Sequence, residues 1–442
     1  MKAATLESKF PILAVEHDCI ISKDADITVA YKVELPELFT VTRNEYEAIH
    51  SAWAKAVKVL PNYSIVHRQD WFIEENYTPD IQRDDLSFLS RSFERHFNER
   101  PYLRHTSYLF LTKTTKERSR TQSNFTALTR NFIIPKEMQD KDTVTRFLES
   151  CDQFERIIND SGFVRITRMR KDEITGTENS AGIIEKYFSL SQEETTCLQD
   201  LTLGAAEMKV GDNCLCLHTL SDTDDLPGKV ATDMRYERLS TDRSDCRLSF
   251  AAPIGVLLTC NHIVNQYLFI DDPAENLKKF EKQARNMHSL SRYSRSNQIN
   301  REWIEEYLNE AHSLGLTSIR AHCNVLAWSD DRNRLKQIKN DVGSQLALME
   351  CKPRHNTVDT PTLFWAAIPG NAGDFPFEES YYTFIEQALC FFIGESCSRD
   401  SLSPFGIRMV DRLTGKPVHL DISDLPMRKG VITNLSLIHI SE

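Results

Sequence analysis

Glycine is scarce in this sequence, with 15 residues among 442, about half of the usual share of ~7%. Loops that cradle phosphates with several glycines therefore have little material to be built from. No stretch of the sequence approaches the roughly 18 consecutive apolar residues that a membrane-spanning helix needs. The 11 cysteines form an odd set without a C-x-x-C pair, which argues against a disulfide framework and predicts a reduced, cytosolic protein.

Acidic residues outnumber basic ones. The formal charge is 53 minus 64, or -11, and the pI is near 5.7. This balance favours solubility and argues against a globally basic nucleic-acid-binding protein, so any contact with nucleic acid needs a local patch. A length of 442 residues exceeds one ordinary domain at ~100 to 200 residues per domain, and we expect more than one.

The opening third of the chain predicts elements in the order β-β-α-β-α-β. Units of this order usually form an antiparallel sheet. The predicted fold class is therefore α+β, ferredoxin-like or related, with antiparallel sheets and helices on one face. The elements are a hairpin of strands at 12–15 and 27–35 around a turn at 22–24, a helix from a Thr42–Glu45 capping box to Pro61, strands at 63–73 and 106–111, and a helix at 84–98.

The rest of the chain to residue 370 continues the α+β pattern. We expect one N-terminal α+β domain over residues 1–370, with subunits of about 1–115 and 116–370. Its predicted elements are solvated loops at 114–123 and 171–180, a helix at 142–159, a short strand at 163–169, a strand-rich stretch at 201–270, helices from Asp272 to about Met287 and from about Trp303 to Gly315, a strand at 318–328, a helix capped by Asp330 and an apolar strand at 362–368.

Two groups of cysteine and histidine residues could carry chemistry. Cys214, Cys216 and His218 share one face of a strand and could bind zinc, but structural zinc sites rarely take three ligands from one strand, so packing in the core is favoured. The pairs Cys260 with His262 and His322 with Cys323 could suggest a nucleophile and a base. Adjacent strand positions point to opposite faces, however, and no glycine-turned elbow accompanies either pair. We therefore assign no catalytic, cofactor-binding or metal-binding residue.

A local basic segment stands out against the acidic chain. Between Lys278 and Arg301 the charge is 7 minus 1, or +6, because Glu281 is the one acidic residue. Clustered basic residues on a helix and loop suit phosphate backbones, but they also suit an acidic partner protein. The candidate phosphate or partner contacts are Lys278, Lys279, Lys282, Arg285, Arg292, Arg295 and Arg301.

Gly415 and Lys416 are the remaining candidates for a phosphate-binding loop. A Walker A loop needs G-x-x-x-x-G-K-[ST], but Val410 and Pro417 occupy the first glycine and the hydroxyl positions. The segment instead predicts a tight turn between strands at 407–410 and 418–422.

Several runs in this order resemble the TraG-type conjugative-transfer ATPases of Bacteroidetes mobile elements, which are related to the CagE/TrbE-type ATPases of type IV secretion systems. The resemblance covers essentially residues 1–434. The runs are HRQDW at 67–71, FNERP at 97–101 with the strand at 106–112, NQY at 265–267 leading to Asp272, LFWAAIPGN at 363–371, PFG at 404–406, TGKP at 414–417 and MRKGVITN at 427–434.

The resemblance implies that residues 371–434 are a connector and the first strands of an incomplete RecA-like α/β motor domain. In that family the Walker A loop follows shortly after the position of Asn434. The full-length parent would then be an ATPase that uses ATP and magnesium, and this fragment would be inactive. Residues 435–442, read back into codons, reproduce a transposase adaptor of sequencing libraries, so we expect an artefact there.

The resemblance also implies a role. We expect the assembly or docking region of a conjugative DNA transfer ATPase, a homo-oligomer in its full-length form. It would lie in the cytoplasm, peripheral to the inner membrane through other conjugation proteins, without binding nucleotide itself. The alternatives are a stand-alone nucleic-acid-binding module that uses residues 278–301, and a cysteine- or zinc-dependent enzyme. We also expect that deleting residues 371–442 improves solubility, because unpaired strand edges near 407–432 would be removed.

Overall fold

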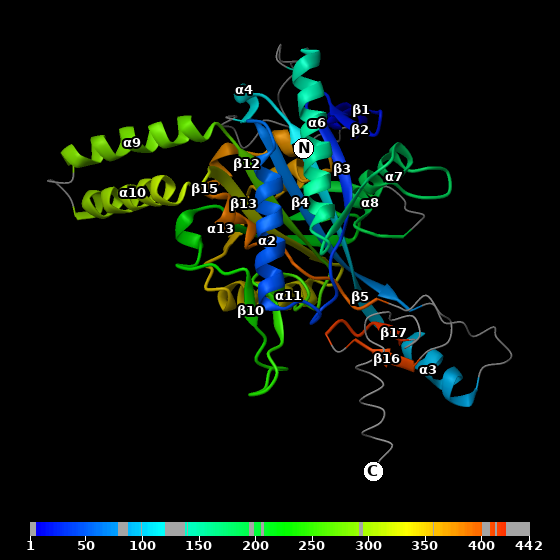
Figure 1. Cartoon of the computed structure of the whole chain (residues 1–442). Coiled ribbons are helices and arrows are strands. Elements are labelled where there is room, and N and C mark those ends of the chain that lie inside the picture. The colour runs from blue at the N-terminus through cyan, green and yellow to red at the C-terminus, as the bar shows by residue number, and fades with distance from the viewer. Residues whose placement is uncertain are drawn as a thin grey trace.

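A computed structural model describes residues 6–77, 87–98, 100–119, 138, 140–193, 199–204, 207–290, 295–356, 358–399, 407–411 and 413–420. Most of these residues surround one large antiparallel sheet (Figure 1). Its main path runs β1-β2-β3-β5-β4-β12-β13-β9-β8-β7, while β6 pairs with β3, β14 with β9 and β15 with β13. The predicted α+β class with antiparallel pairing is confirmed.

The strands of this sheet come from almost the whole described chain. Because β4 from the first third pairs with β12 from the second half, the sheet is larger than a ferredoxin-like unit. The strands are β1 Ile12–Glu16, β2 Cys19–Ser22, β3 Ile27–Glu34, β4 Ser64–Asn76, β5 Pro101–Lys113, β6 Arg165–Arg168, β7 Leu201–Leu203, β8 Met208–Val210, β9 Asn213–Leu220, β12 His262–Ile270, β13 Ser318–Ser329, β14 Arg354–Asn356 and β15 Tyr381–Phe384.

Helices cover both faces of the sheet, so the prediction of helices on one face is wrong. The even-numbered side chains of β4 and β12, such as Val66 and Leu268, pack under one set of helices. The odd-numbered ones, such as Trp71 and Ile263, pack under a second set on the other face. Because helices cover both faces of the sheet, every residue of β12 is buried. The first face carries α2 (Arg43–Lys58), α6 (Lys141–Asp160), α11 (Arg332–Leu348) and α13 (Ile385–Leu389), and the second α7 (Lys171–Thr175), α8 (Ile183–Ser189) and α12 (Thr360–Ala366).

Local signals placed most of the long helices correctly. The capping box forms as predicted, because the backbone N–H of Thr42 donates to Glu45 Oε2 at 2.7 Å. The helix expected at 142–159 is α6, and Gly162 follows it with a φ of +75°. The helix expected after Asp330 is α11, but its cap is the next residue, Asp331.

Four local predictions are wrong. The opening hairpin has three strands rather than two, because β2 lies between β1 and β3. The apolar run at 362–368 lies mostly in helix α12, not in a strand. The loop expected at 171–180 begins with α7. The solvated loop expected at 114–123 contains the short helix α4 (Lys116–Ser119), and Arg118 within it is buried.

The segment that follows the run at 363–371 is built into the body of the protein. Strand β15 pairs with β13, and α13 packs beside α2 in the core of the first face. A strap then leads from Cys390 to Arg399. The hairpin of β16 (Ile407–Val410) and β17 (Pro417–Leu420) confirms both predicted strands, with Gly415 at a φ of +73° in the turn. The remaining predicted motor residues, including 435–442, lie outside the described residues.

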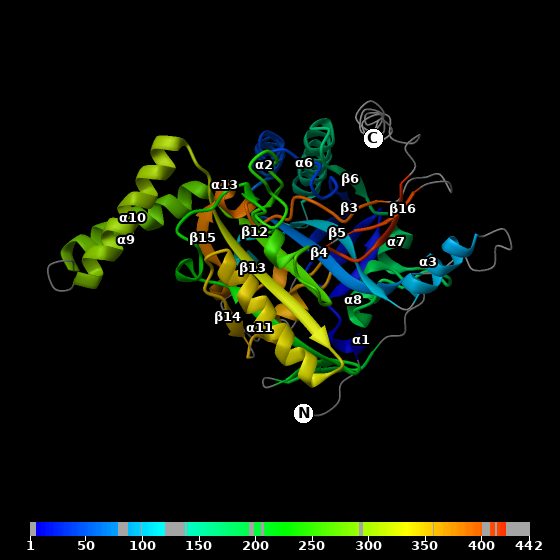
Figure 2. The same cartoon turned by 90° about the horizontal axis from the view of Figure 1, so that it is seen from below.

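Helices α9 (Pro273–Leu290) and α10 (Arg295–Leu314) form a long hairpin that projects from the sheet (Figures 1 and 2). At its base, the rings of Phe280 and Tyr307 lie 5.0 Å apart, and Tyr307 stacks on Phe384 at 4.5 Å. These contacts fix the hairpin to β15. The outer part of the hairpin extends beyond these contacts.

Helix α3 (Phe88–Asn98) lies at the opposite side of the molecule from the hairpin (Figure 2). Within the described residues, no helix is long and apolar enough to cross a membrane.

Candidate functional site

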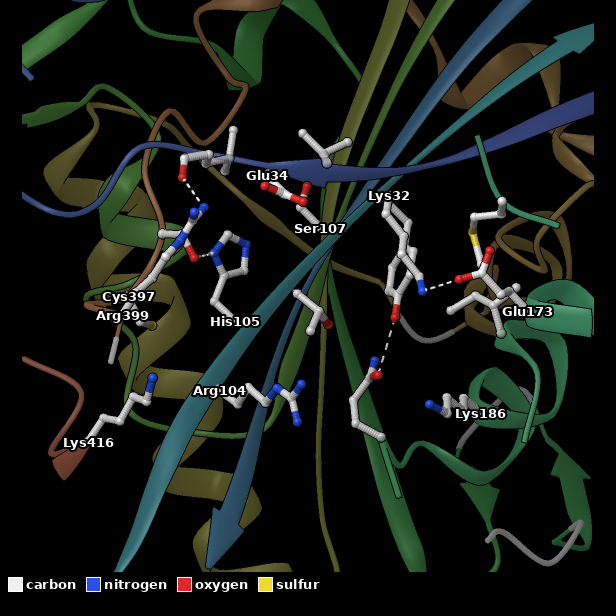
Figure 3. A pocket seen from close by; sticks show the side chains of 18 of the residues that line it. Lys32, Glu34, Arg104, His105, Ser107, Glu173, Lys186, Cys397, Arg399 and Lys416 are labelled. Carbon is white, nitrogen blue, oxygen red and sulfur yellow. Dashed lines mark hydrogen bonds and ion pairs between the residues drawn. The ribbon is translucent and has the colours of Figure 1, made fainter. Parts of the chain in front are cut away.

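A polar pocket of about 580 Å³ lies where the strap and the β16–β17 turn meet the sheet (Figure 3). Its walls come from β3, β5, α8 and the strap, together with the turn that carries Lys416. Cationic side chains predominate over the two lining carboxylates, Glu34 and Glu173. The cationic residues that line it are Lys32, Arg104, Lys186, Arg399 and Lys416.

Much of this positive charge is already engaged within the protein. Lys32 pairs with Glu173, and Arg104 Nη1 lies 3.1 Å from Glu75 Oε1. Arg399 Nη2 donates to the carbonyl oxygen of Leu35 at 2.7 Å. Lys416 Nζ donates to the carbonyl oxygen of Ser398 at 3.0 Å. The pocket therefore joins the C-terminal segment to the sheet, and we define it as the junction pocket.

A buried chain of polar and charged side chains runs from the sheet to the wall of the junction pocket. Arg68 Nη2 donates to Asp70 Oδ1 at 3.0 Å, and Asp70 Oδ1 lies 3.0 Å from His105 Nε2. The other ring nitrogen of His105 lies 3.2 Å from Ser396 Oγ. Burial alone would raise the pKa of Asp70, but Arg68 and His105 hold it below its usual range.

This serine, histidine and aspartate set superficially suggests a hydrolytic triad. In such a triad the aspartate serves to orient and stabilise the imidazole. Here Asp70 is shared with Arg68, whose guanidinium also donates to the carbonyl oxygen of Ile393 at 2.6 Å. The set therefore anchors the strap to β4 and β5, and we assign it a structural role.

Glu395 is fully buried beside this chain. Tyr46 Oη and the backbone N–H of Ser249 each donate to Glu395 Oε2 at 3.0 Å, and Ser249 Oγ donates to Oε1 at 3.0 Å. Burial raises the pKa of Glu395 to about 7, although these donors and the nearby Arg68 oppose the shift. Glu395 therefore titrates near neutral pH inside the strap.

We expect Glu395 to make stability depend on pH. Its folded pKa lies above the unfolded value of ~4.3, so its contribution is complete below that value and is lost as the pH rises through about 7. A Glu395→Gln variant should lack this decline, which amounts to roughly 3 kcal/mol between about pH 5 and about pH 8. Urea unfolding of both proteins at about pH 5 and about pH 8 measures the difference. Equal pH dependence in the two proteins would contradict the prediction.

The opposite face of the central strands carries a polar ladder. His67 Nε2 and Gln69 Nε2 donate to Asn265 Oδ1 at 3.2 and 2.8 Å. Asn265 Nδ2 donates to Asn324 Oδ1 at 3.0 Å, and Gln69 Nε2 also donates to the carbonyl oxygen of Ala367 at 2.7 Å. The runs at 67–71, 265–267 and 363–371 therefore meet in space. Hydrogen bonds between their polar groups link β4, β12, β13 and the end of α12.

Arg118 forms a second buried charge cluster. Its Nη2 atom lies 2.7 Å from Asp26 Oδ2 and 3.0 Å from Asp374 Oδ1, and its Nη1 atom contacts Asp24. Burial raises the pKa of Asp26 even though Arg118 opposes the shift. Asp374 follows the Pro-Gly-Asn run closely, so this cluster ties that run to the β2–β3 turn. The sequence gave no local sign of it, because the partners lie far apart in the chain.

The cysteine and histidine candidates lie in the core. Cys214 and Cys216 are 2% and 3% exposed and pack with the apolar side chains under α11, which confirms the packing interpretation. His262 Nδ1 donates to the carbonyl oxygen of Cys260 at 2.8 Å rather than to its thiol. Burial raises the pKa of the Cys260 thiol to about 12 and lowers that of His262 to about 4. Among the described residues, no three His, Cys, Asp or Glu side chains group as a metal site would require.

The predicted basic contacts lie on the projecting hairpin. Lys279 Nζ donates to Tyr382 Oη at 3.0 Å at the base, and Arg301 Nε pairs with Glu305 at 2.6 Å. Arg292 lies outside the described residues. The other four, Lys278, Lys282, Arg285 and Arg295, are exposed.

Sequence reasoning missed the acidic residues of the same hairpin. Helix α10 continues past Arg301 with Glu302, Glu305, Glu306 and Glu310. These glutamates are visible in the sequence, but they lie just beyond Arg301, where the predicted basic segment ends. The structure places a basic helix beside an acidic one, so the hairpin is not a uniformly basic surface.

Two family models match parts of the chain. Residues 406–441 match the TraG P-loop domain, and residues 1–51 match a domain of unknown function described as "B. Theta Gene description (DUF3875)". The first match supports a TraG-type conjugation protein. It begins just before the β16–β17 hairpin and includes most of residues 435–442, whose attribution to an adaptor stays a prediction. No curated protein matches the chain.

Proposed function

We propose that this chain is the N-terminal assembly and docking region of a TraG-type conjugative transfer ATPase of a type IV secretion system. The observation that carries the proposal is the match of residues 406–441 to the TraG P-loop domain. The β16–β17 hairpin at the start of that match contacts the body at the junction pocket, through Lys416 and Ser398. In the proposed role, the body connects the motor to its partners through this contact.

We place the catalytic step in the motor domain of the full-length parent rather than at Gly415 and Lys416. At Gly415 and Lys416 the sequence has Pro417 where a Walker A loop has a hydroxyl. ATP and magnesium would act in the full-length parent, where a Walker A loop binds phosphates at a helix N-terminus. The partners are other conjugation proteins at the inner membrane, and the location is cytoplasmic and peripheral.

The alternative of a nucleic-acid-binding module has less support. Phosphate binding needs positive charge along a continuous track. On the hairpin, the basic residues belong to α9 and four glutamates to α10, so positive charge does not continue from one helix to the next. The third candidate, a cysteine-dependent enzyme, needs an accessible thiolate, whereas burial raises the pKa of Cys216 and Cys397 to about 11 and about 12.

Expression of the chain in a donor cell that carries a TraG-type element tests the proposal. We expect conjugation frequency to fall, because the chain occupies docking partners without driving transfer. The purified chain should show no magnesium-dependent ATP hydrolysis. A matched control is a variant with the paired substitutions Arg68→Leu and Asp70→Leu, which disturbs the body at equal expression. Unchanged transfer at high expression, or steady ATP hydrolysis, would overturn the proposal.

A further inference from the structure

The α9–α10 hairpin carries opposite charges on its two outer edges. A residue step rotates about 100° around a helix, so Lys278, Lys282 and Arg285 lie on the side of α9 opposite Phe280. Phe280 contacts α10 through Tyr307. The three cations therefore form the edge of the hairpin that points away from α10, and we define them as the basic edge.

The outer edge of α10 is acidic. Ala311 is 4% exposed and marks the inner side of this helix. Glu302 and Glu306 lie nine and five positions before it, about 180° and about 140° around the helix. Both are exposed. Ile299, at 37% exposed, lies on the same side. We define Glu302, Glu306 and Ile299 as the acidic edge.

The two edges match in height along the hairpin. Phe280 contacts Tyr307, so these residues mark the same level. Moving two and five positions outward along α9 reaches Lys282 and Arg285. On antiparallel α10, Glu306 and Glu302 lie one and five positions outward from Tyr307. At about 1.5 Å per residue, Lys282 and Glu306 therefore differ in level by about 1.5 Å, and Arg285 and Glu302 share one level.

Charges on these edges are not neutralised inside the hairpin. In the part of the chain that the structure describes, ion pairs of its outer portion join Arg301 to Glu305 and His312 to Glu281. Lys282 and Glu306 take part in none of them. Both edges thus keep net charge available for a partner.

We propose that this hairpin joins successive copies of the chain, with the basic edge of one copy docked on the acidic edge of the next; the inference rests on the assembly role proposed above. Parallel hairpins side by side bring Lys282 and Arg285 to the levels of Glu306 and Glu302 of the neighbour. Because the edges differ, the contact is heterologous and propagates around a ring or along a filament. Ile299, at 37% exposed, adds apolar contact area between the charged residues.

Charge complementarity favours a second copy over other partners. A nucleic acid would bind the basic edge but would be repelled by the acidic edge. An acidic protein would likewise contact the basic edge alone. A second copy satisfies both edges with the same pair of helices. The interaction should weaken by about tenfold or more between low and high salt, since exposed charges are screened over about 10 Å at 0.1 M.

Charge-reversal variants of the full chain test the proposal by analytical ultracentrifugation at low salt. We expect the natural sequence to self-associate. The variant with Lys282→Glu and Arg285→Glu has two acidic edges and should be monomeric. The variant with Glu302→Lys and Glu306→Lys has two basic edges and should be monomeric too. An equimolar mixture of the two should associate again, and so should the fourfold variant, whose edges are exchanged.

The control reverses two exposed lysines elsewhere, Lys55→Glu on α2 and Lys336→Glu on α11, and should associate like the natural sequence. All substituted side chains are exposed, and thermal unfolding checks that each variant folds. A monomeric natural sequence, single-edge variants that still associate, or a mixture that stays monomeric would each overturn the hairpin contact. These outcomes leave the transfer assay of the proposed function unaffected, so the two proposals can fail separately.

Discussion

Removal of residues 371–442 is expected to leave the chain unable to fold, whereas removal of residues 421–442 should leave a folded protein. The shorter deletion keeps every strand of the described sheet. The longer one removes β15, which pairs with β13 from Ser318 to Ala321. It thereby exposes the edge and one face of a central strand.

The deleted segment also supplies core side chains. Phe375, Phe391, Phe392 and Ile393 are at most 5% exposed. Each such side chain contributes about 1.5–3 kcal/mol when fully buried, and a whole domain is stable by only about 5–15 kcal/mol. The deletion would further leave Arg118 without Asp374 and Arg68 without the carbonyl oxygen of Ile393.

Soluble yield and circular dichroism melting of the two truncated chains measure this contrast. The structure thus reverses the expectation, drawn from the sequence, that cutting at residue 371 improves solubility. A cut after residue 420 leaves β15 and the strap in place, whereas a cut at residue 371 removes both together with β16 and β17. A folded, cooperatively melting 1–370 chain would show that β15 and the strap are dispensable.

The sequence predicted elements best where periodicity was long. Helices α2, α6 and α11 have apolar residues at helical spacing over 16 or more residues, and each was expected within a few positions. The prediction for the run at 362–368 failed because six consecutive apolar residues after Thr362 suit a buried strand and a buried helix equally. Its start did carry a helix signal, since Pro361 occupies the first turn of α12.

The buried charged residues beside the candidate site were harder to predict, for a physical reason. Arg118 sits in a polar segment with basic neighbours, which is typical of a solvated loop. Its partners Asp24, Asp26 and Asp374 are up to 256 residues away in the sequence. Glu395 likewise meets Tyr46 across 349 residues. Long-range partners decide whether a charge is buried, and one sequence does not reveal them.

Replacement of Arg118 by leucine should destabilise the protein by about 3–5 kcal/mol, because it leaves buried carboxylates without their cation. Asp26 and Asp374 are fully or nearly buried, at 0% and 3% exposed. Burial already raises the pKa of Asp26 while Arg118 is present. Without the guanidinium, that pKa should rise further. Chemical unfolding of the natural sequence and the variant measures the loss.

The pH dependence of this loss separates a charge effect from a packing effect. An acid with a raised folded pKa contributes stability that is complete below its unfolded pKa and is lost as the pH rises through the folded value. The Arg118→Leu defect should therefore shrink toward acidic pH, where Asp26 takes up a proton. Adding Asp26→Asn and Asp374→Asn should recover part of the loss at neutral pH. Arg43→Leu, an exposed control paired at 3.5 Å with Glu47, should change stability by about 0.5 kcal/mol or less. A defect of equal size at every pH would mean that lost packing, not unpaired charge, causes it.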